Sequence, residues 1–152
     1  MKPYRISIVG TGYVGLCTGI GFATKGYKVI TSSHNPEKVT SINKGIPPFY
    51  EPGLKELLQK VVKNGCLKCT PDREEAILNT DITFIATGTP SQPNGSINLQ
   101  HIKKSAHEIG QALNKKNVYH LVVVKSTVVP LLWLLLSRRR LRFFRICLLL
   151  CL

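Results

Sequence analysis

Residues 5–15, Arg-Ile-Ser-Ile-Val-Gly-Thr-Gly-Tyr-Val-Gly, join an apolar strand pattern to a glycine-rich loop. Gly10, Gly12 and Gly15 have the spacing G-x-G-x-x-G. In a dinucleotide-binding loop the first glycine allows a tight turn, the second lets the backbone approach a pyrophosphate, and the third lets the next helix pack closely. The N-terminus of that helix favours the anion through its unpaired N–H groups and its dipole. This stretch therefore predicts a dinucleotide-binding strand, loop and helix.

Strand and helix patterns alternate along the chain that follows. Apolar runs predict strands at residues 27–32, 67–70, 81–86 and 118–125. Amphipathic patterns predict helices at residues 13–25, 36–45, 54–64 and 98–114, and a further helix capped by Asp72. Such alternation is typical of an α/β fold with helices on both faces of a parallel sheet. We therefore expect a Rossmann-type doubly wound parallel sheet of about five strands, incomplete at its C-terminal edge.

Two turns follow predicted strands at the edge of the sheet where open α/β folds bind their ligands. They are Thr87-Gly88-Thr89-Pro90 and Ser126-Thr127. A third loop, Ile-Pro-Pro-Phe-Tyr-Glu-Pro-Gly at residues 46–53, is rigid because of its three prolines. This loop is either a substrate-contacting segment or a connector.

Composition indicates one moderately basic domain. The chain has 152 residues, 43% of them hydrophobic, and a formal net charge of +13. Much of the charge is local, because residues 131–152 hold five arginines and no acidic residue. The remaining excess is typical of solvated surface lysines on a protein that binds anionic small molecules, so no nucleic-acid partner is expected.

The cysteines and histidines do not form a pattern that carries chemistry. Five cysteines follow a start without a secretory signal, which indicates a reducing, cytoplasmic setting. Cys66 and Cys69 could form half of a zinc site, but their nearest counterparts, Cys147 and Cys151, lie in an atypical tail, so we expect no metal. The histidines are expected to be structural or solvent-exposed, namely His34, His101, His107 and His120.

Four motifs occur in one order at domain-compatible spacing. They are the glycine fingerprint, Tyr50-Glu51-Pro52-Gly53-Leu54, Gly88-Thr89-Pro90 and Val124-Lys125-Ser126-Thr127. Over residues 4–130 the chain resembles the N-terminal half of nucleotide-sugar dehydrogenases of the UDP-glucose 6-dehydrogenase type. The resemblance implies an NAD-binding domain at residues 1–130 of an oligomeric enzyme of polysaccharide biosynthesis. Such an enzyme oxidises the sugar C6 alcohol twice, converting UDP-glucose to UDP-glucuronate.

The same resemblance implies roles for individual residues. The pyrophosphate would be held by the glycine loop and the start of its helix, and the cofactor cleft would be lined by the turn at residues 87–90. Thr127 corresponds to a threonine that helps to order water near the reacting carbon, and Glu51 would be structural or substrate-adjacent. The cofactor-binding residues implied in this way are Gly10, Gly12, Tyr13, Val14, Gly15, Thr87, Thr89 and Pro90.

Ser33 departs from the family pattern. It lies 18 residues after Gly15, near the spacing of the acidic residue that binds the ribose hydroxyls of NAD. A serine cannot offer a charged bidentate acceptor, so NAD affinity is expected to fall by about 1.5–3 kcal/mol. Without a negative charge at this position, a 2′-phosphate is not repelled, and His34 or Lys38 could bind it. NADP is therefore an alternative cofactor.

The tail at residues 131–152 departs further. Ten of its 22 residues are Leu, and it contains no Gly, Asp, Glu or Asn. We interpret it as the product of a frameshift or an early truncation. The family's nucleophilic cysteine lies in a C-terminal half that this chain does not match, and we assign its role to none of the five cysteines. The chain is therefore expected to bind the cofactor without a catalytic and substrate domain, and to show no turnover alone.

Two alternative functions remain. In the first, the arginines and flanking apolar runs of a genuine tail dock a dinucleotide-binding module on a membrane surface or on nucleic acid. Neither apolar run approaches the roughly 20 residues that span a bilayer, so no transmembrane segment is expected. In the second, the dehydrogenase acts on GDP-mannose or on a UDP-N-acetylhexosamine.

Overall fold

The computed structural model describes residues 4–126 and the backbone of residues 144–148. Strands and helices alternate as the sequence predicts, and most observed ends lie within two residues of the expected ones. The strands are β1 (Arg5–Val9), β2 (Lys28–Ser32), β3 (Leu67–Thr70), β4 (Ile82–Ile85), β5 (His120–Val124) and β6 (Phe144–Leu148). The helices are α1 (Tyr13–Thr24), α2 (Pro36–Asn43), α3 (Leu54–Lys63), α4 (Arg73–Leu78) and α5 (Gln100–Leu113).

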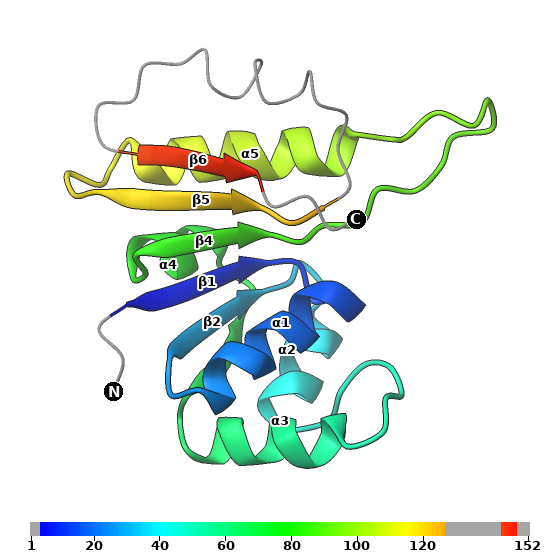
Figure 1. The fold of residues 1–152 in the computed structure, drawn as a ribbon, viewed down its shortest axis with the longest axis vertical. Helices are drawn as coiled ribbons and strands as arrows, with labels where there is room; N and C mark the ends of the chain where they lie inside the picture. The colour runs from blue at the N-terminus through cyan, green and yellow to red at the C-terminus, as the bar shows by residue number, and fades with distance from the viewer. Residues whose placement is uncertain (1–3, 127–143, 149–152) are drawn as a thin grey trace.

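All strands join one parallel sheet in the order β3-β2-β1-β4-β5-β6 (Figure 1). β1 pairs with β2 on one side, where Ser7 faces Ile30, and with β4 on the other, where Ser7 faces Thr83. The chain builds one half of the sheet outward from β1 and then returns to build the other half. The boundary between β1 and β4 is therefore the switch point at which open α/β sheets form a ligand crevice.

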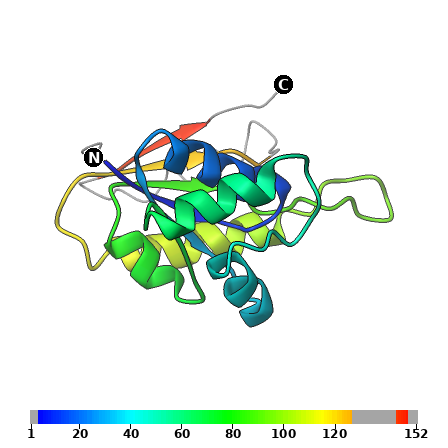
Figure 2. The same ribbon diagram turned by 90° about the horizontal axis from the view of Figure 1, so that it is seen from below.

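The helices bury the two faces of the sheet separately. Figures 1 and 2 show α1 on one face, and α4 and α5 on the opposite face. On the α1 face, Ile6 and Ile8 of β1 pack with Leu16 and Ile20. On the other face, Val9 joins a cluster that includes residues of α4, α5 and β5. Neighbouring residues of β1 therefore enter different clusters, as expected for a central parallel strand that is buried on both faces. The parallel sheet with helices on both faces confirms the predicted Rossmann-type fold.

Side-chain caps fix the starts of two helices. Asn35 precedes Pro36 at the first position of α2, and its Oδ1 accepts hydrogen bonds from the backbone N–H groups of Glu37 and Lys38. Asp72 caps α4 by accepting from the N–H of Glu75 at 3.0 Å. Both caps were predicted, since Asn and Asp at these positions satisfy N–H groups that have no partner inside the helix.

The two edges of the sheet are covered in different ways. On β3, the side-chain amide of Asn43 accepts from the N–H of Cys69 at 2.8 Å and donates to its carbonyl at 2.9 Å. On β5, the backbone of Phe144–Leu148 adds a sixth parallel strand, in which Ile146 pairs with Val122. The sequence predicted an incomplete edge here. The observed strand instead supplies the N–H and C=O partners that an exposed edge lacks.

No helix in the described ranges, 4–126 and 144–148, is long and apolar enough to cross a membrane.

A row of buried, hydrogen-bonded polar side chains links β1, β4 and β5. Ser7 Oγ lies 2.6 Å from Thr83 Oγ1, which lies 2.8 Å from Nε2 of the fully buried His120. Nζ of Lys116 lies 3.1 Å from Nδ1 of His120, where the ammonium is the donor. Burial and the positive charge of Lys116 lower the pKa of His120 to about 4. His120 is therefore a neutral structural residue at neutral pH.

Acidification is expected to destabilise the fold through His120. Because its pKa is about 4 in the folded chain and 6.5 in the unfolded chain, the unfolded state binds more protons between these values. The stabilisation is complete above pH 6.5 and is lost as the pH falls, by about 2 kcal/mol between pH 7.5 and 5. Carboxylates titrate mostly below this range. Urea unfolding followed by circular dichroism at several pH values measures the loss.

His120→Gln is expected to flatten this pH dependence, whereas His107→Gln, on the exposed side of α5, is expected to leave it unchanged. An equally steep loss in His120→Gln would contradict the assignment.

Candidate dinucleotide-binding site

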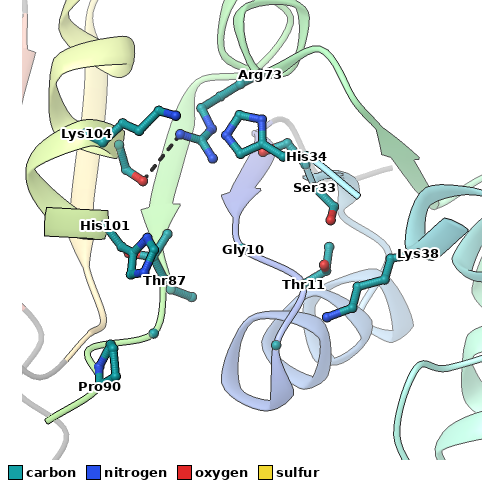
Figure 3. A pocket seen from close by; sticks show the side chains of 15 residues that line it. Gly10, Thr11, Ser33, His34, Lys38, Arg73, Thr87, Pro90, His101 and Lys104 are labelled. Atoms are coloured by element: carbon teal, nitrogen blue, oxygen red, sulfur yellow. Dashed lines mark hydrogen bonds between the residues drawn. The ribbon is translucent and has the colours of Figure 1, made fainter. Parts of the chain in front are cut away.

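A cavity of about 470 Å³ opens at the carboxyl ends of β1, β2 and β4 (Figure 3). At this point the loops that follow the three strands lie beside the first turns of α4 and α5. Its walls are formed by Gly10, Thr11, Gly12, Ser32, Ser33, His34, Lys38, Arg73, Ala86, Thr87, Gly88, Pro90, His101, Lys104 and Ser105. The cavity lies at the switch point of the sheet, which is where a ligand is expected.

Two of the three fingerprint glycines are required by close backbone contacts. Gly10 has a φ of +114°, and a Cβ there would lie 2.6 Å from the carbonyl oxygen of Ala86. A Cβ on Gly15 would lie 2.2 Å from the carbonyl oxygen of Gly10. Gly15 is buried and does not line the cavity, so its position serves the packing of α1 on the loop.

Gly12 is different because a Cβ there would meet nothing within 4 Å. It is the N-cap of α1, it makes no side-chain cap, and the first turn of α1 holds no acidic residue. The first N–H groups of the helix therefore have no intrahelical partner, and no acidic residue in the first turn competes for them. The open space at Gly12, beside these N–H groups, is suited to an anion.

Tyr13 holds the proline-rich loop against the start of α1. Its hydroxyl donates a hydrogen bond to Glu51 Oε2 at 2.5 Å, and its ring centroid lies 5.0 Å from that of Phe49. The hydrogen bond to Glu51 raises the pKa of Tyr13. Tyr13 and Val14 are exposed and lie outside the cavity wall, so in this structure any contact that they make with a pyrophosphate comes from their backbone.

Thr87 lines the cavity. Its Oγ1 is buried and has no hydrogen-bond partner among the described residues. The carbonyl of Thr87 is fixed by Ser126, whose Oγ donates to it at 2.7 Å. Since buried hydroxyls normally have a partner, Thr87 Oγ1 is suited to a ligand. Pro90 also lines the cavity and Thr89 does not, while Thr127 lies outside the described residues.

Ser33 directly follows β2. Its N–H donates to the carbonyl of Thr70 at 3.2 Å, and its Oγ accepts from the N–H of Asn35 at 3.3 Å. Lys38, from the first turn of α2, and His34 flank it on the cavity wall. This part of the wall therefore presents a neutral hydroxyl between basic side chains.

Arg73 was not predicted from the sequence, and it is the best-anchored basic residue in the cavity. Its side chain is only 10% exposed, Nη1 donates to Ser105 Oγ at 3.3 Å, and the same nitrogen pairs with Glu108. Burial lowers the pKa of Arg73, and Glu108 opposes this effect. Nε is buried without a partner among the described residues. The sequence indicates only that Arg73 lies in the first turn of the helix after β3, and nothing local to it indicates a ligand contact.

His101 and Lys104 were also missed as site residues. Both lie on exposed positions of α5 and line the cavity opposite the loop after β2. His34 is exposed as expected, and its Nε2 lies 3.9 Å from Glu108 Oε2. His101 and Lys104 lie on the same cavity as Ser33 only because α5 packs beside α4 in the folded chain.

Residues 4–132 match the family model described as the UDP-glucose/GDP-mannose dehydrogenase family, NAD binding domain. The chain belongs to this family. Similar proteins include the GDP-mannose 6-dehydrogenase of Pseudomonas syringae pv. tomato, with 46% identity over 83% of this chain and 29% of that protein. This member of the dehydrogenase family thus spans less than a third of that relative.

Solved structures of the family agree with the fold. A GDP-mannose dehydrogenase from Pseudomonas aeruginosa in a ternary complex has a TM-score of 0.86 and 38% identity, covering 93% of this chain and 35% of its own. A UDP-glucose dehydrogenase from Pyrobaculum islandicum has the same TM-score and identity, covering 94% and 34%. These two likenesses identify an NAD-binding domain of the dehydrogenase family equally well, and they leave the sugar open.

The cysteines that the structure describes in this family member lie away from the cavity wall. Cys17 and Cys69 are partly or fully buried, and burial raises the pKa of both thiols. A raised pKa disfavours the thiolate that nucleophilic catalysis requires. Within the described residues no group of three or more His, Cys, Asp or Glu could hold a metal ion.

Proposed function

We propose that this chain is the cofactor-binding half of a nucleotide-sugar dehydrogenase that oxidises the C6 hydroxyl of UDP-glucose. The observation that carries the proposal is the open space at Gly12, at the start of α1. This space lies in the cavity at the switch point of the sheet, in a chain that belongs to this family. A pyrophosphate fits there because the helix N-terminus supplies N–H donors and a favourable dipole.

The chain's own residues bind and orient the cofactor. The N–H groups at the start of α1 would hold the pyrophosphate, and Thr87 Oγ1 would donate to or accept from the nicotinamide half. The family implies NAD as the hydride acceptor, whereas the neutral Ser33 of this chain also admits NADP. When bound, the nicotinamide supplies the redox chemistry, while Thr127 would order a water molecule beside the reacting carbon.

GDP-mannose is the second candidate substrate. The Pseudomonas syringae relative with 46% identity bears that substrate in its name, and the two solved structures do not separate the sugars. Titration of UDP-glucose and GDP-mannose into the chain saturated with dinucleotide compares them. Tighter binding of GDP-mannose would replace UDP-glucose in this proposal.

The covalent step requires a cysteine thiolate placed beside the nicotinamide. The three described cysteines do not line the cavity, so we propose that the chain binds the cofactor without oxidising the sugar by itself. A cytoplasmic location fits the free thiols that this chemistry needs.

Isothermal titration of the chain with NAD and NADP tests the proposed function. We expect one dinucleotide site per chain, and no formation of reduced nicotinamide when UDP-glucose is added. ADP-ribose, which keeps the pyrophosphate, is the matched control ligand and is expected to bind in competition. A folded chain that binds none of these three ligands would refute the proposal, and sugar oxidation by the chain alone would refute its division of labour.

A further inference from the structure

The cavity holds more positive charge than a pyrophosphate needs. Lys38, Arg73 and Lys104 line it together with His34, and none of the residues that line it is Asp or Glu. A pyrophosphate at a helix N-terminus is bound by backbone N–H groups and requires no basic side chain. Glu108 balances part of the charge of Arg73, but the lining with Lys38 and Lys104 remains positive and favours a second anionic group on the same ligand.

Arg73 is built to meet such a group. Ser105 and Glu108 fix its guanidinium through Nη1, while the buried Nε keeps an N–H without a partner in the part of the chain that the structure describes. Glu108 also approaches His34 Nε2 at 3.9 Å, which draws Arg73 and His34 to one side of the cavity (Figure 3). A guanidinium offers parallel N–H groups that match phosphate oxygens, and a buried donor left unpaired is costly.

The end of β2 determines which part of the ligand lies beside these cations. In dinucleotide-binding folds the residue at this point contacts the adenosine ribose, and a carboxylate there binds the 2′-hydroxyl of NAD. Ser33 is neutral, and its Oγ accepts a backbone hydrogen bond from Asn35. Nothing at this position repels a 2′-phosphate, and His34 and Lys38 flank it on the cavity wall.

We propose that this part of the cavity binds the 2′-phosphate of NADP, with Arg73 and Lys38 as its cationic partners and His34 beside them, and that the chain prefers NADP to NAD. The inference rests on the proposed function, because the ribose lies at Ser33 only when the pyrophosphate lies at Gly12. The preference is set by charge, so it weakens as salt screens the exposed lysine.

Titration of the whole chain with NAD and NADP at low salt tests the preference. We expect NADP to bind about tenfold more tightly than NAD, the scale of a charge-assisted phosphate contact. Ser33→Asp is expected to invert the preference by about the same factor, because its carboxylate repels the 2′-phosphate and accepts from the ribose hydroxyls.

Lys38→Gln is expected to weaken NADP binding about fivefold more than NAD binding, since an exposed contact to phosphate contributes about 1 kcal/mol. Lys103→Gln is the matched control, because Lys103 is exposed on α5 next to Lys104 but does not line the cavity. It should change neither dissociation constant. Both lysines are exposed, so these variants are expected to fold like the parent chain.

The outcomes separate this inference from the proposed function. NAD binding as tightly as NADP, or more tightly, overturns the 2′-phosphate site and leaves the dehydrogenase proposal standing. An NADP preference that Ser33→Asp and Lys38→Gln do not alter overturns the assignment to these residues. If neither dinucleotide binds to a chain that unfolds cooperatively in urea, the proposed function fails and the 2′-phosphate site fails with it.

Discussion

Gly15→Ala is expected to lower the free energy of unfolding by about 2–3 kcal/mol, the usual cost of forcing extra atoms into a packed contact. The added Cβ would lie 2.2 Å from the carbonyl oxygen of Gly10 and 3.3 Å from Cβ of Ala86. The first of these contacts is with backbone, so no side-chain rotation relieves it. The helix must move away from the turn after β1. Such a loss is a large share of the stability of a typical domain.

Gly21→Ala is the matched control on the same helix. Gly21 is exposed in α1, and a Cβ there meets nothing within 4 Å. Alanine has the higher helix propensity, so this variant is expected to stabilise the chain by about 0.5–1 kcal/mol. Urea unfolding monitored by circular dichroism gives both values. A Gly15→Ala chain as stable as the parent would show that α1 does not pack on the loop as described.

The order of elements could be predicted because each element carries a local signal. The periodicity of the apolar residues places β1 to β5, and Asn35 with Pro36 marks the start of α2 through a cap that is local in sequence. The strand predicted at residues 118–125 is shorter in the structure, since Val118 and Tyr119 are exposed before His120. Single-residue ends depend on packing, which the pattern does not report.

The sixth strand could not be predicted in this way. Residues 144–148 lie within a Leu/Arg-rich run whose composition lacks the turn residues that mark strand ends. Their pairing with β5 depends on the unpaired edge that β5 offers, and this edge exists only after the sheet has formed.

The residues of the candidate site likewise fall into those with a local sequence signal and those that only the fold brings together. The glycine loop and the turn at residues 87–90 were predicted because their backbone demands are encoded locally. Arg73 and Lys104 were not, since they come from helices that approach the loop after β2 only in the folded chain. The contact of Arg73 with Glu108, across two helices, likewise has no sequence spacing that indicates it. Ser33 was informative as a departure from an expected carboxylate, and the structure adds Arg73 to the neighbouring His34 and Lys38 that the sequence had already indicated.

Gly12→Val is expected to abolish dinucleotide binding with little change in stability. Gly12 has φ of −74° and ψ of −176°, an extended conformation that any residue adopts, and a Cβ there is not obstructed. The valine side chain would project into the space proposed for the pyrophosphate and keep it from the N–H groups of α1. We expect the dissociation constant for NAD and NADP to rise at least about 100-fold, which corresponds to about 2.7 kcal/mol of binding energy.

Gly21→Val provides the control, because it makes the same change on α1 at an exposed position outside the cavity wall. It should leave both dissociation constants unchanged. The midpoint of thermal unfolding of Gly12→Val should stay within a few degrees of the parent, since exchanging glycine for an apolar residue at an N-cap costs only about 1 kcal/mol. A stable Gly12→Val chain that still binds dinucleotide at the parental affinity would place the pyrophosphate elsewhere. Because the ribose at Ser33 is positioned from that phosphate, such a result would also remove the basis for a 2′-phosphate beside Arg73.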